Sequence, residues 1–172
     1  MPLVPFLHRA AAGSHLTAEE AYQAMGALLD GTASEAQIAG LLVALRVKGE
    51  TAAELAGFAR AMRERMVVVD AGPDVIDTAG TGGDNSGTFN ISTVAALVMA
   101  GAGARVAKHG NRSISSSTGS ADLLEALGIR IAMSPEEAAT AVREIGIGFL
   151  FAPALHPAMK HAATTTRMFC SR

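Results

Sequence analysis

Residues 77–93 read D-T-A-G-T-G-G-D-N-S-G-T-F-N-I-S-T. They follow a short apolar run, Val75-Ile76, and precede a longer one from Val94 to Ala100. This order predicts a strand, a glycine-rich loop and the start of a helix. Glycines let the backbone turn sharply and let a ligand approach the main chain closely. The stretch therefore predicts a loop at the end of a strand that leads directly into a helix.

The start of that helix is rich in residues that cap helices. Asn90, Ser92 and Thr93 are typical N-cap types, and a helix N-terminus with free N–H groups attracts phosphate. The alternative is a tight glycine turn that only packs the strand on the helix. Four glycines, Asp84 and the Ser/Thr cluster together favour a phosphate site over that alternative.

Composition indicates a folded protein with one medium domain or two small ones. The 172 residues are 49% hydrophobic and 17% charged, which excludes a disordered chain. A net charge of −2 gives no electrostatic footprint for nucleic acid. The single cysteine, Cys170, excludes an intramolecular disulfide, and no targeting or bilayer-spanning segment is seen. We therefore expect a cytoplasmic protein.

Two patterns divide the chain near residue 70. Residues 1–70 contain only helical patterns, with capping boxes that begin at Thr17, Ser34 and Thr51. The last of these helices is expected to bury Leu55, Phe58, Ala59 and Met62, and Lys48 is expected at the surface. We predict a helical bundle over 1–70 that serves as a dimerisation domain.

Strand-like and helix-like segments alternate over 71–172, which we expect to form a partial phosphoribosyl-binding domain. The expected strands are 74–77, 104–108, 129–132 and 147–151, and the expected helices are 92–101, 118–127, 134–146 and 153–163. This spacing predicts a parallel sheet covered by helices. The fold class is therefore α/β, with a helical bundle followed by a parallel-sheet domain.

A second loop follows the second expected strand and reads K-H-G-N-R-S-I-S-S-S-T-G-S over residues 108–120. Lys108 and Arg112 bring positive charge, the serines bring hydroxyl donors, and Gly110 and Gly119 are expected to add flexibility. If the first two strands are neighbours, both loops meet beyond their carboxyl ends, where α/β sheets bind ligands. A solvated serine-rich loop is the alternative, but a basic pair opposite a phosphate-type loop favours an anion site.

Asp84 does not fit a simple phosphate site, because a carboxylate repels phosphate. It is either a surface cap or a group that acts through a divalent cation or ribose hydroxyls. Mg²⁺ uses few protein oxygens alongside substrate phosphates, and Ser92 and Asp84 are the candidate contributors.

The strings D-T-A-G-T-G-G-D, F-N-I-S-T, K-H-G-N-R-S-x-S-S and G-S-A-D-L-L-E-A-L-G resemble anthranilate phosphoribosyltransferases. The resemblance implies a nucleoside phosphorylase/phosphoribosyltransferase-like fold and a homodimer formed through the helical domain. It also implies a glycosyltransferase of tryptophan biosynthesis, which moves phosphoribose from phosphoribosyl diphosphate to the amine of anthranilate with Mg²⁺. No covalent nucleophile is needed, so no catalytic residue is nominated.

The resemblance also implies the site residues. Ser92 matches a metal ligand, and Gly80 and Asn111 match residues that contact anthranilate as well. The phosphoribosyl diphosphate is expected to contact both loops, at Gly80, Gly83, Asp84, Thr88, Asn90, Ile91, Ser92, Thr93, Lys108, His109, Gly110, Asn111, Arg112, Ser113, Ile114, Ser115, Ser116 and Ser120.

The resemblance ends after about Ala163, whereas the family continues for about as long again. Family members have an anthranilate-binding arginine close to position 166, which is Thr166 in this chain. The family's Mg²⁺-binding acidic pair lies beyond the matching region. We therefore expect a truncated or frame-shifted member, incomplete at the C-terminus and with impaired activity. The alternatives are a non-catalytic relative that dimerises and binds phosphate, or a relative of pyrimidine nucleoside phosphorylases.

Overall fold

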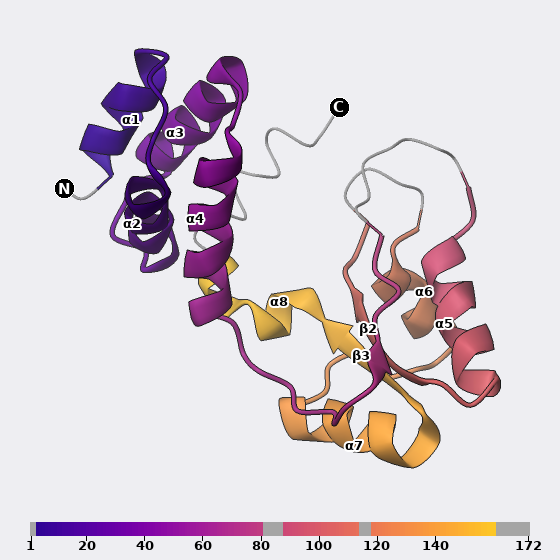
Figure 1. Ribbon diagram of the computed structural model, residues 1–172. Helices are drawn as coiled ribbons and strands as arrows, with labels where there is room; N and C mark the ends of the chain where they lie inside the picture. The colour runs from indigo at the N-terminus through magenta and orange to yellow at the C-terminus, as the bar shows by residue number, and fades with distance from the viewer. Residues whose placement is uncertain (1–2, 81–87, 114–117, 161–172) are drawn as a thin grey trace. The chain divides into compact units, whose positions relative to one another are not determined.

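The computed structural model describes residues 3–80, 88–113 and 118–160 (Figure 1). These residues form two compact units. The helical unit comprises the described residues of 3–66 and 156–160, and the α/β unit comprises those of 67–155. Within the described ranges, every helix is too short or too polar to span a lipid bilayer.

Four helices build the helical unit: α1 (Val4–Ala11), α2 (Ala18–Leu29), α3 (Glu35–Lys48) and α4 (Ala52–Glu64). A short 3₁₀ helix, η1 (Pro157–Met159), belongs to the same unit. The predicted capping boxes at Thr17, Ser34 and Thr51 begin α2, α3 and α4, each with both reciprocal hydrogen bonds. Helix α2 packs on α4 and α1 packs on α3. The core includes Leu3, Leu28, Ile38, Leu41, Leu45 and Phe58.

The predicted apolar face of α4 is correct for Phe58 and Met62, which pack in or against the core, and wrong for Leu55 and Ala59. Of its four expected core residues only Phe58 is buried, and Leu55 is 55% exposed. The buried face consists instead of Glu54, Gly57, Phe58 and Ala61. A Cβ on Gly57 would lie 2.2 Å from the carbonyl oxygen of Ala18, so α2 and α4 approach too closely for a larger side chain there. Close contact with α2 therefore requires a small residue at position 57 of α4.

Glu54 is fully buried in the helical unit, and both of its carboxylate oxygens accept hydrogen bonds. Its carboxylate accepts hydrogen bonds from the N–H groups of Leu16 and Thr51, both at 2.8 Å, and from the Thr51 hydroxyl at 3.0 Å. Lys48 Nζ lies 2.9 Å away, and its side chain is only 3% exposed, so the expectation of a surface Lys48 is wrong. A buried carboxylate needs a counter-ion, and Lys48 supplies it.

Three parallel strands form the sheet of the α/β unit, in the order β1 (Val75–Ile76), β2 (Arg105–Gly110) and β3 (Ile147–Phe151). The helices are α5 (Ile91–Gly101), α6 (Ser120–Ala126), α7 (Pro135–Ile145) and the single turn α8 (Ala152–Leu155). As predicted, a capping box at Ser134 begins α7, and Gly146, with φ +80°, ends it. The expected parallel α/β arrangement is confirmed (Figure 1).

Two elements expected in this region differ from those in the structure. No strand forms at 129–132, where Ile131 is held by side-chain packing with Ala121, Leu124 and Phe149 instead of by a ladder. The expected helix over 153–163 is broken within its described part, since α8 ends at Leu155 and η1 begins at Pro157. Proline lacks an N–H and disfavours the helical conformation of the residue before it, and His156 has φ −124° and ψ 59°.

Successive residues of β2 and β3 face opposite sides of the sheet. Ala107 and Leu150 pack with α7, whereas Phe149 packs with α6. Lys108 is paired with Phe149 and His109 with Leu150 in the register of the two strands. Lys108 therefore lies on the α6 side of the sheet and His109 on the α7 side.

Candidate anion-binding site

Strands β1 and β2 are direct neighbours and run parallel, with Ile76 opposite Val106. The sequence predicts a shared ligand site if the first two strands are neighbours, and the structure shows that they are. The glycine stretch leaves the carboxyl end of β1, and the loop that begins at Lys108 leaves the carboxyl end of β2. Both therefore emerge at the same edge of the sheet, where open α/β sheets bind ligands.

Lys108 is the buried cation of this edge, with 2% of its surface exposed. Its Nζ donates to Ser92 Oγ at 3.0 Å and to the carbonyl of His109 at 3.3 Å. Burial lowers the pKa of Lys108, and the charge of Asp77 opposes that change. In the described part of the chain no carboxylate forms an ion pair with this ammonium. A buried charge is costly unless an opposite charge compensates it, so Lys108 favours an anion at this position.

Asn90 caps α5 as the sequence predicted, and its side chain hydrogen-bonds to residues of both loops. Its Oδ1 accepts hydrogen bonds from the Thr93 N–H at 3.1 Å, the Thr93 hydroxyl at 2.8 Å and the Ser92 hydroxyl at 3.1 Å. Its Nδ2 donates to Ser120 Oγ at 3.3 Å. The Thr78 hydroxyl donates to the carbonyl of Ser92 at 2.9 Å, which ties the end of β1 to the first turn of α5. The N-terminus of α5 is therefore held next to both loops.

The ends of the second loop are held together by Asp122, which the sequence analysis did not nominate. Its Oδ2 accepts hydrogen bonds from the N–H groups of Ser113 and Gly119, both at 2.9 Å. A Cβ on Gly119 would lie 2.4 Å from the Ser113 nitrogen, and one on Gly110 would lie 2.5 Å from the Phe149 ring. The two glycines therefore allow close approach at these positions, and the flexibility expected of them stays a prediction. The position of Asp122, three residues after Gly119, is where a capping box places its acid.

Arg112 differs from Lys108 because its charge is already matched. Its guanidinium donates to both carboxylate oxygens of Glu125, at 2.6 and 2.8 Å, and lies 3.4 Å from Asp122. The hydrogen bonds to Glu125 and the nearby charge raise the pKa of Arg112. An anion at this edge would have to compete with Glu125 for Arg112, whereas no carboxylate of the described residues pairs with Lys108.

Comparison with known proteins matches the two units separately. Residues 4–66 match the helical bundle domain of a glycosyl transferase family, and residues 72–172 match the a/b domain of that family. The second match alone covers more than half of the chain. The chain belongs to this glycosyl transferase family.

Two similar members share a name. An anthranilate phosphoribosyltransferase of Solibacter usitatus is 62% identical over 165 residues, which are 94% of this chain and 48% of the relative. The enzyme of that name from Geobacillus thermodenitrificans is 58% identical over 157 residues, covering 91% of this chain and 46% of the relative. The chain spans about half the length of these curated relatives.

Solved structures of the glycosyl transferase family agree with the fold. The anthranilate phosphoribosyltransferase of Thermus thermophilus superposes with a TM-score of 0.86 at 48% identity, over 100% of this chain and 52% of that chain. The enzyme of Saccharomyces cerevisiae, in complex with PRPP and Mg, superposes with a TM-score of 0.85 at 28% identity. That match covers 98% of this chain and 51% of the yeast chain.

The other predicted site residues differ in how far the structure describes them. Asn111 accepts the N–H of Ala121 at its carbonyl and that of Arg112 at its side chain, at 3.1 and 2.8 Å. Among the described candidates, those with exposed positions are Gly80, Thr88, Ile91, Asn111 and Arg112. Gly83, Asp84, Ile114, Ser115 and Ser116 lie outside the described residues.

The described residues do not form a magnesium site by themselves. No group of three or more His, Cys, Asp or Glu suited to a metal occurs among them. Ser92 offers one neutral oxygen, and the Lys108 ammonium lies 3.0 Å from it. Mg²⁺ requires several hard oxygen ligands. Any magnesium bound by this member of the glycosyl transferase family must therefore draw most of its ligands from elsewhere.

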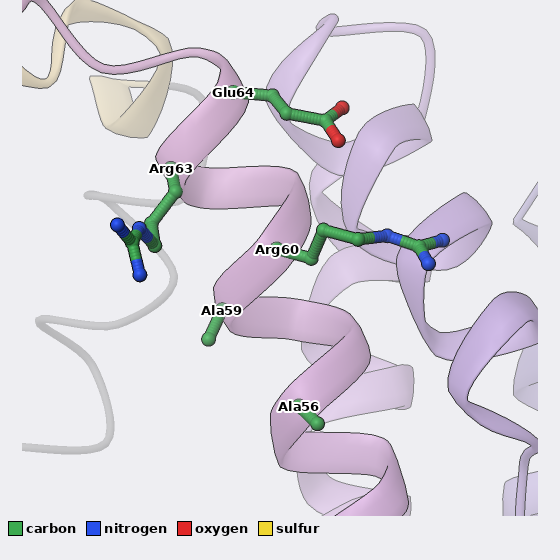
Figure 2. A pocket seen from close by; sticks show the side chains of 5 residues that line it. All are labelled: Ala56, Ala59, Arg60, Arg63 and Glu64. Atoms are coloured by element: carbon green, nitrogen blue, oxygen red, sulfur yellow. The ribbon is translucent and has the colours of Figure 1, made fainter.

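A cavity of about 430 Å³ is lined by residues of α4 in the helical unit (Figure 2). Ala56, Ala59, Arg60, Arg63 and Glu64 line it. Figure 2 shows Arg60 and Arg63 projecting to different sides of α4, and Arg60 is already paired with Glu19 and stacked over the Tyr22 ring. The two guanidinium groups do not converge, so this cavity lacks the features of an anion site.

Proposed function

We propose that this chain binds phosphoribosyl diphosphate and acts in an anthranilate phosphoribosyltransferase. The reaction transfers phosphoribose to the amine of anthranilate, a step of tryptophan biosynthesis. The observation that carries the proposal is Lys108, a buried ammonium beside Ser92 with no carboxylate partner among the described residues. The names of the most similar relatives support the same substrates.

The chemistry of the transfer suits this edge of the sheet. When the bond from the anomeric carbon to the diphosphate breaks, positive charge grows on the sugar and negative charge grows on the leaving diphosphate. Lys108 and the N-terminus of α5 would stabilise that negative charge without moving. Asp122 would keep the second loop closed around the substrate, which contributes positioning. No covalent nucleophile is required.

Magnesium enters this proposal as part of the substrate, bound to the diphosphate. Mg²⁺ commonly reaches enzymes with substrate phosphates and keeps several of its waters. The yeast relative in complex with PRPP and Mg supports this assignment. Within the proposal, the region 71–172 holds the phosphoribosyl group and the region 1–70 dimerises, in a cytoplasmic enzyme.

Calorimetry with phosphoribosyl diphosphate and Mg²⁺ tests the proposal. Lys108→Ala should weaken binding about tenfold or more, because a charge-assisted hydrogen bond is lost. Lys160→Ala removes the same charge from an exposed position of the helical unit and should leave the affinity unchanged. Equal affinities for both variants and the unaltered chain, with their circular dichroism spectra also equal, would contradict the proposed site.

A further inference from the structure

Asp77 sits at the carboxyl end of β1 and makes three hydrogen bonds. One carboxylate oxygen accepts the N–H of Ala79 at 3.0 Å and the N–H of His109 at 3.1 Å. The other oxygen lies 2.8 Å from Nδ1 of the His109 ring. Asp77 therefore fixes the first turn of the glycine stretch, the backbone of the second loop and one imidazole ring at the same time.

The contact between Asp77 and His109 determines where the neutral ring carries its proton. An ionised carboxylate only accepts hydrogen bonds, so Nδ1 must be the protonated nitrogen and Nε2 must hold a lone pair. His15 of the helical unit shows the opposite case. Lys48 Nζ donates to His15 Nδ1 at 3.0 Å, so the neutral His15 ring carries its proton on Nε2.

The second nitrogen of His109 is available to a ligand. Among the described residues nothing hydrogen-bonds to His109 Nε2, and the side chain is 41% exposed. Strand alternation places His109 on the side of the sheet opposite to Lys108. The Lys108 ammonium and the His109 imidazole therefore have separate partners, Ser92 and Asp77.

We propose that Asp77 is a positioning residue that holds His109 with Nδ1–H on the carboxylate and Nε2 as a hydrogen-bond acceptor for the attacking amine. Its place in catalysis rests on the function proposed above. In that reaction the amine nitrogen bonds to the anomeric carbon while the carbon–oxygen bond to diphosphate breaks. The diphosphate leaves with the bonding electron pair, and the proton lost by the amine passes to Nε2 of His109.

Nuclear magnetic resonance of the 172-residue chain, labelled with ¹⁵N-histidine, tests the role of Asp77 directly. Long-range ¹H–¹⁵N spectra at roughly pH 8.5, well above the ordinary histidine pKa, distinguish the two neutral tautomers. His109→Gln identifies the resonances of His109. We expect Nδ1–H in His109 and Nε2–H in His15 of the same sample.

Asp77→Asn should reverse the tautomer of His109, because the carboxamide nitrogen can donate to Nδ1. The ratio of the two tautomers should change by roughly tenfold or more, as for loss of one charge-assisted hydrogen bond. Asp74→Asn is the matched control, since it removes an exposed carboxylate three residues away and should leave the ratio unchanged. A His109 ring with Nε2–H in the unaltered chain, or an unchanged ratio in Asp77→Asn, would overturn the inference.

Ligand titration separates this inference from the proposed function. Anthranilate with phosphoribosyl diphosphate and Mg²⁺ should shift the His109 Nε2 resonance, whereas benzoate, which lacks the amine, should not. If the proposed function fails, neither compound shifts the resonance, while the tautomer and its dependence on Asp77 remain. If the inference fails, His109 carries the other tautomer whether or not anthranilate binds.

Discussion

Glu54 and Lys108 are both buried, but among the described residues only Glu54 has a counter-ion. Burial alone would raise the pKa of Glu54, but hydrogen bonds from Leu16, Lys48 and Thr51 outweigh it and lower the pKa to about 2. Lys108 has hydroxyl and carbonyl neighbours and no ion-pair partner in the described part of the chain. At the residue scale, the charge of Glu54 stabilises the folded chain, and the charge of Lys108 is suited to binding a ligand.

Glu54→Gln should destabilise the helical unit by about 3 kcal/mol at neutral pH, since it leaves Lys48 buried without its counter-ion. The sequence has one tyrosine, Tyr22 on α2, and no tryptophan, so tyrosine fluorescence in a denaturant titration reports this unit. Glu50→Gln, at an exposed position nearby, should change stability little. An equal effect of the two substitutions would contradict the role given to Glu54.

Acid should act through the same carboxylate. Because the folded pKa of Glu54 lies below the ordinary 4.5, its contribution is fully present above about pH 4.5 and is lost as the pH falls towards 2. The unfolding midpoint of the unaltered chain should therefore fall over this window. Glu54→Gln should show a smaller fall, whereas Glu50→Gln should follow the unaltered chain.

At the scale of elements, local patterns were predicted well and packing was not. Thr17, Ser34, Thr51 and Ser134 begin their helices as expected, because a capping box needs only residues three apart in the sequence. The face that α4 buries depends on how closely α2 approaches it, and one sequence does not show that distance. The absent strand at 129–132 has the same cause, since side-chain packing there replaces backbone pairing.

The candidate site shows the same difference between local sequence patterns, which were predicted, and contacts between distant residues, which were not. Asn90, Ser92 and Lys108 were nominated because they lie in loops with a recognisable order, and the structure brings them together. Asp77 and Asp122 were not nominated as site residues, because their role is to hold other loop groups across 32 and 9 positions of sequence. The pairing of Arg112 with Glu125 was missed for the same reason, although both residues lie in the quoted motifs.

Asp122→Ala should weaken binding of phosphoribosyl diphosphate without removing any group that touches it. The second loop would lose the acceptor that joins Ser113 and Gly119, so binding would have to order the loop. The expected loss of affinity is on the order of fivefold, as for one net hydrogen bond. Glu136→Ala, an exposed acid in the first turn of α7, serves as the control in calorimetry. Unchanged affinity in Asp122→Ala would contradict this role.

At the scale of the whole molecule, both units expose large apolar side chains, and the two units have different proposed roles. The α/β unit carries the candidate site at the edge where β1 and β2 end. The helical unit exposes Val47 at 82%, Val43 at 43% and Leu55 at 55%, and Leu55 lines an apolar pocket of about 150 Å³. Val43 and Val47 lie one turn apart on α3 and share a face. This surface supports the proposal that the helical unit mediates self-association.

Val47→Asp should therefore weaken self-association of the chain. Burying a valine contributes roughly 1.5 kcal/mol or more, and an interface that receives a carboxylate loses that contribution and must also desolvate a charge. Sedimentation over a range of concentrations should show a dimer dissociation constant raised at least about tenfold. Val68→Asp makes the same change at a 71% exposed valine of the α/β unit and should leave the constant unchanged. Equal weakening by both substitutions would show that the effect is not specific to the helical unit, and a monomer at every concentration would remove self-association from the proposed function.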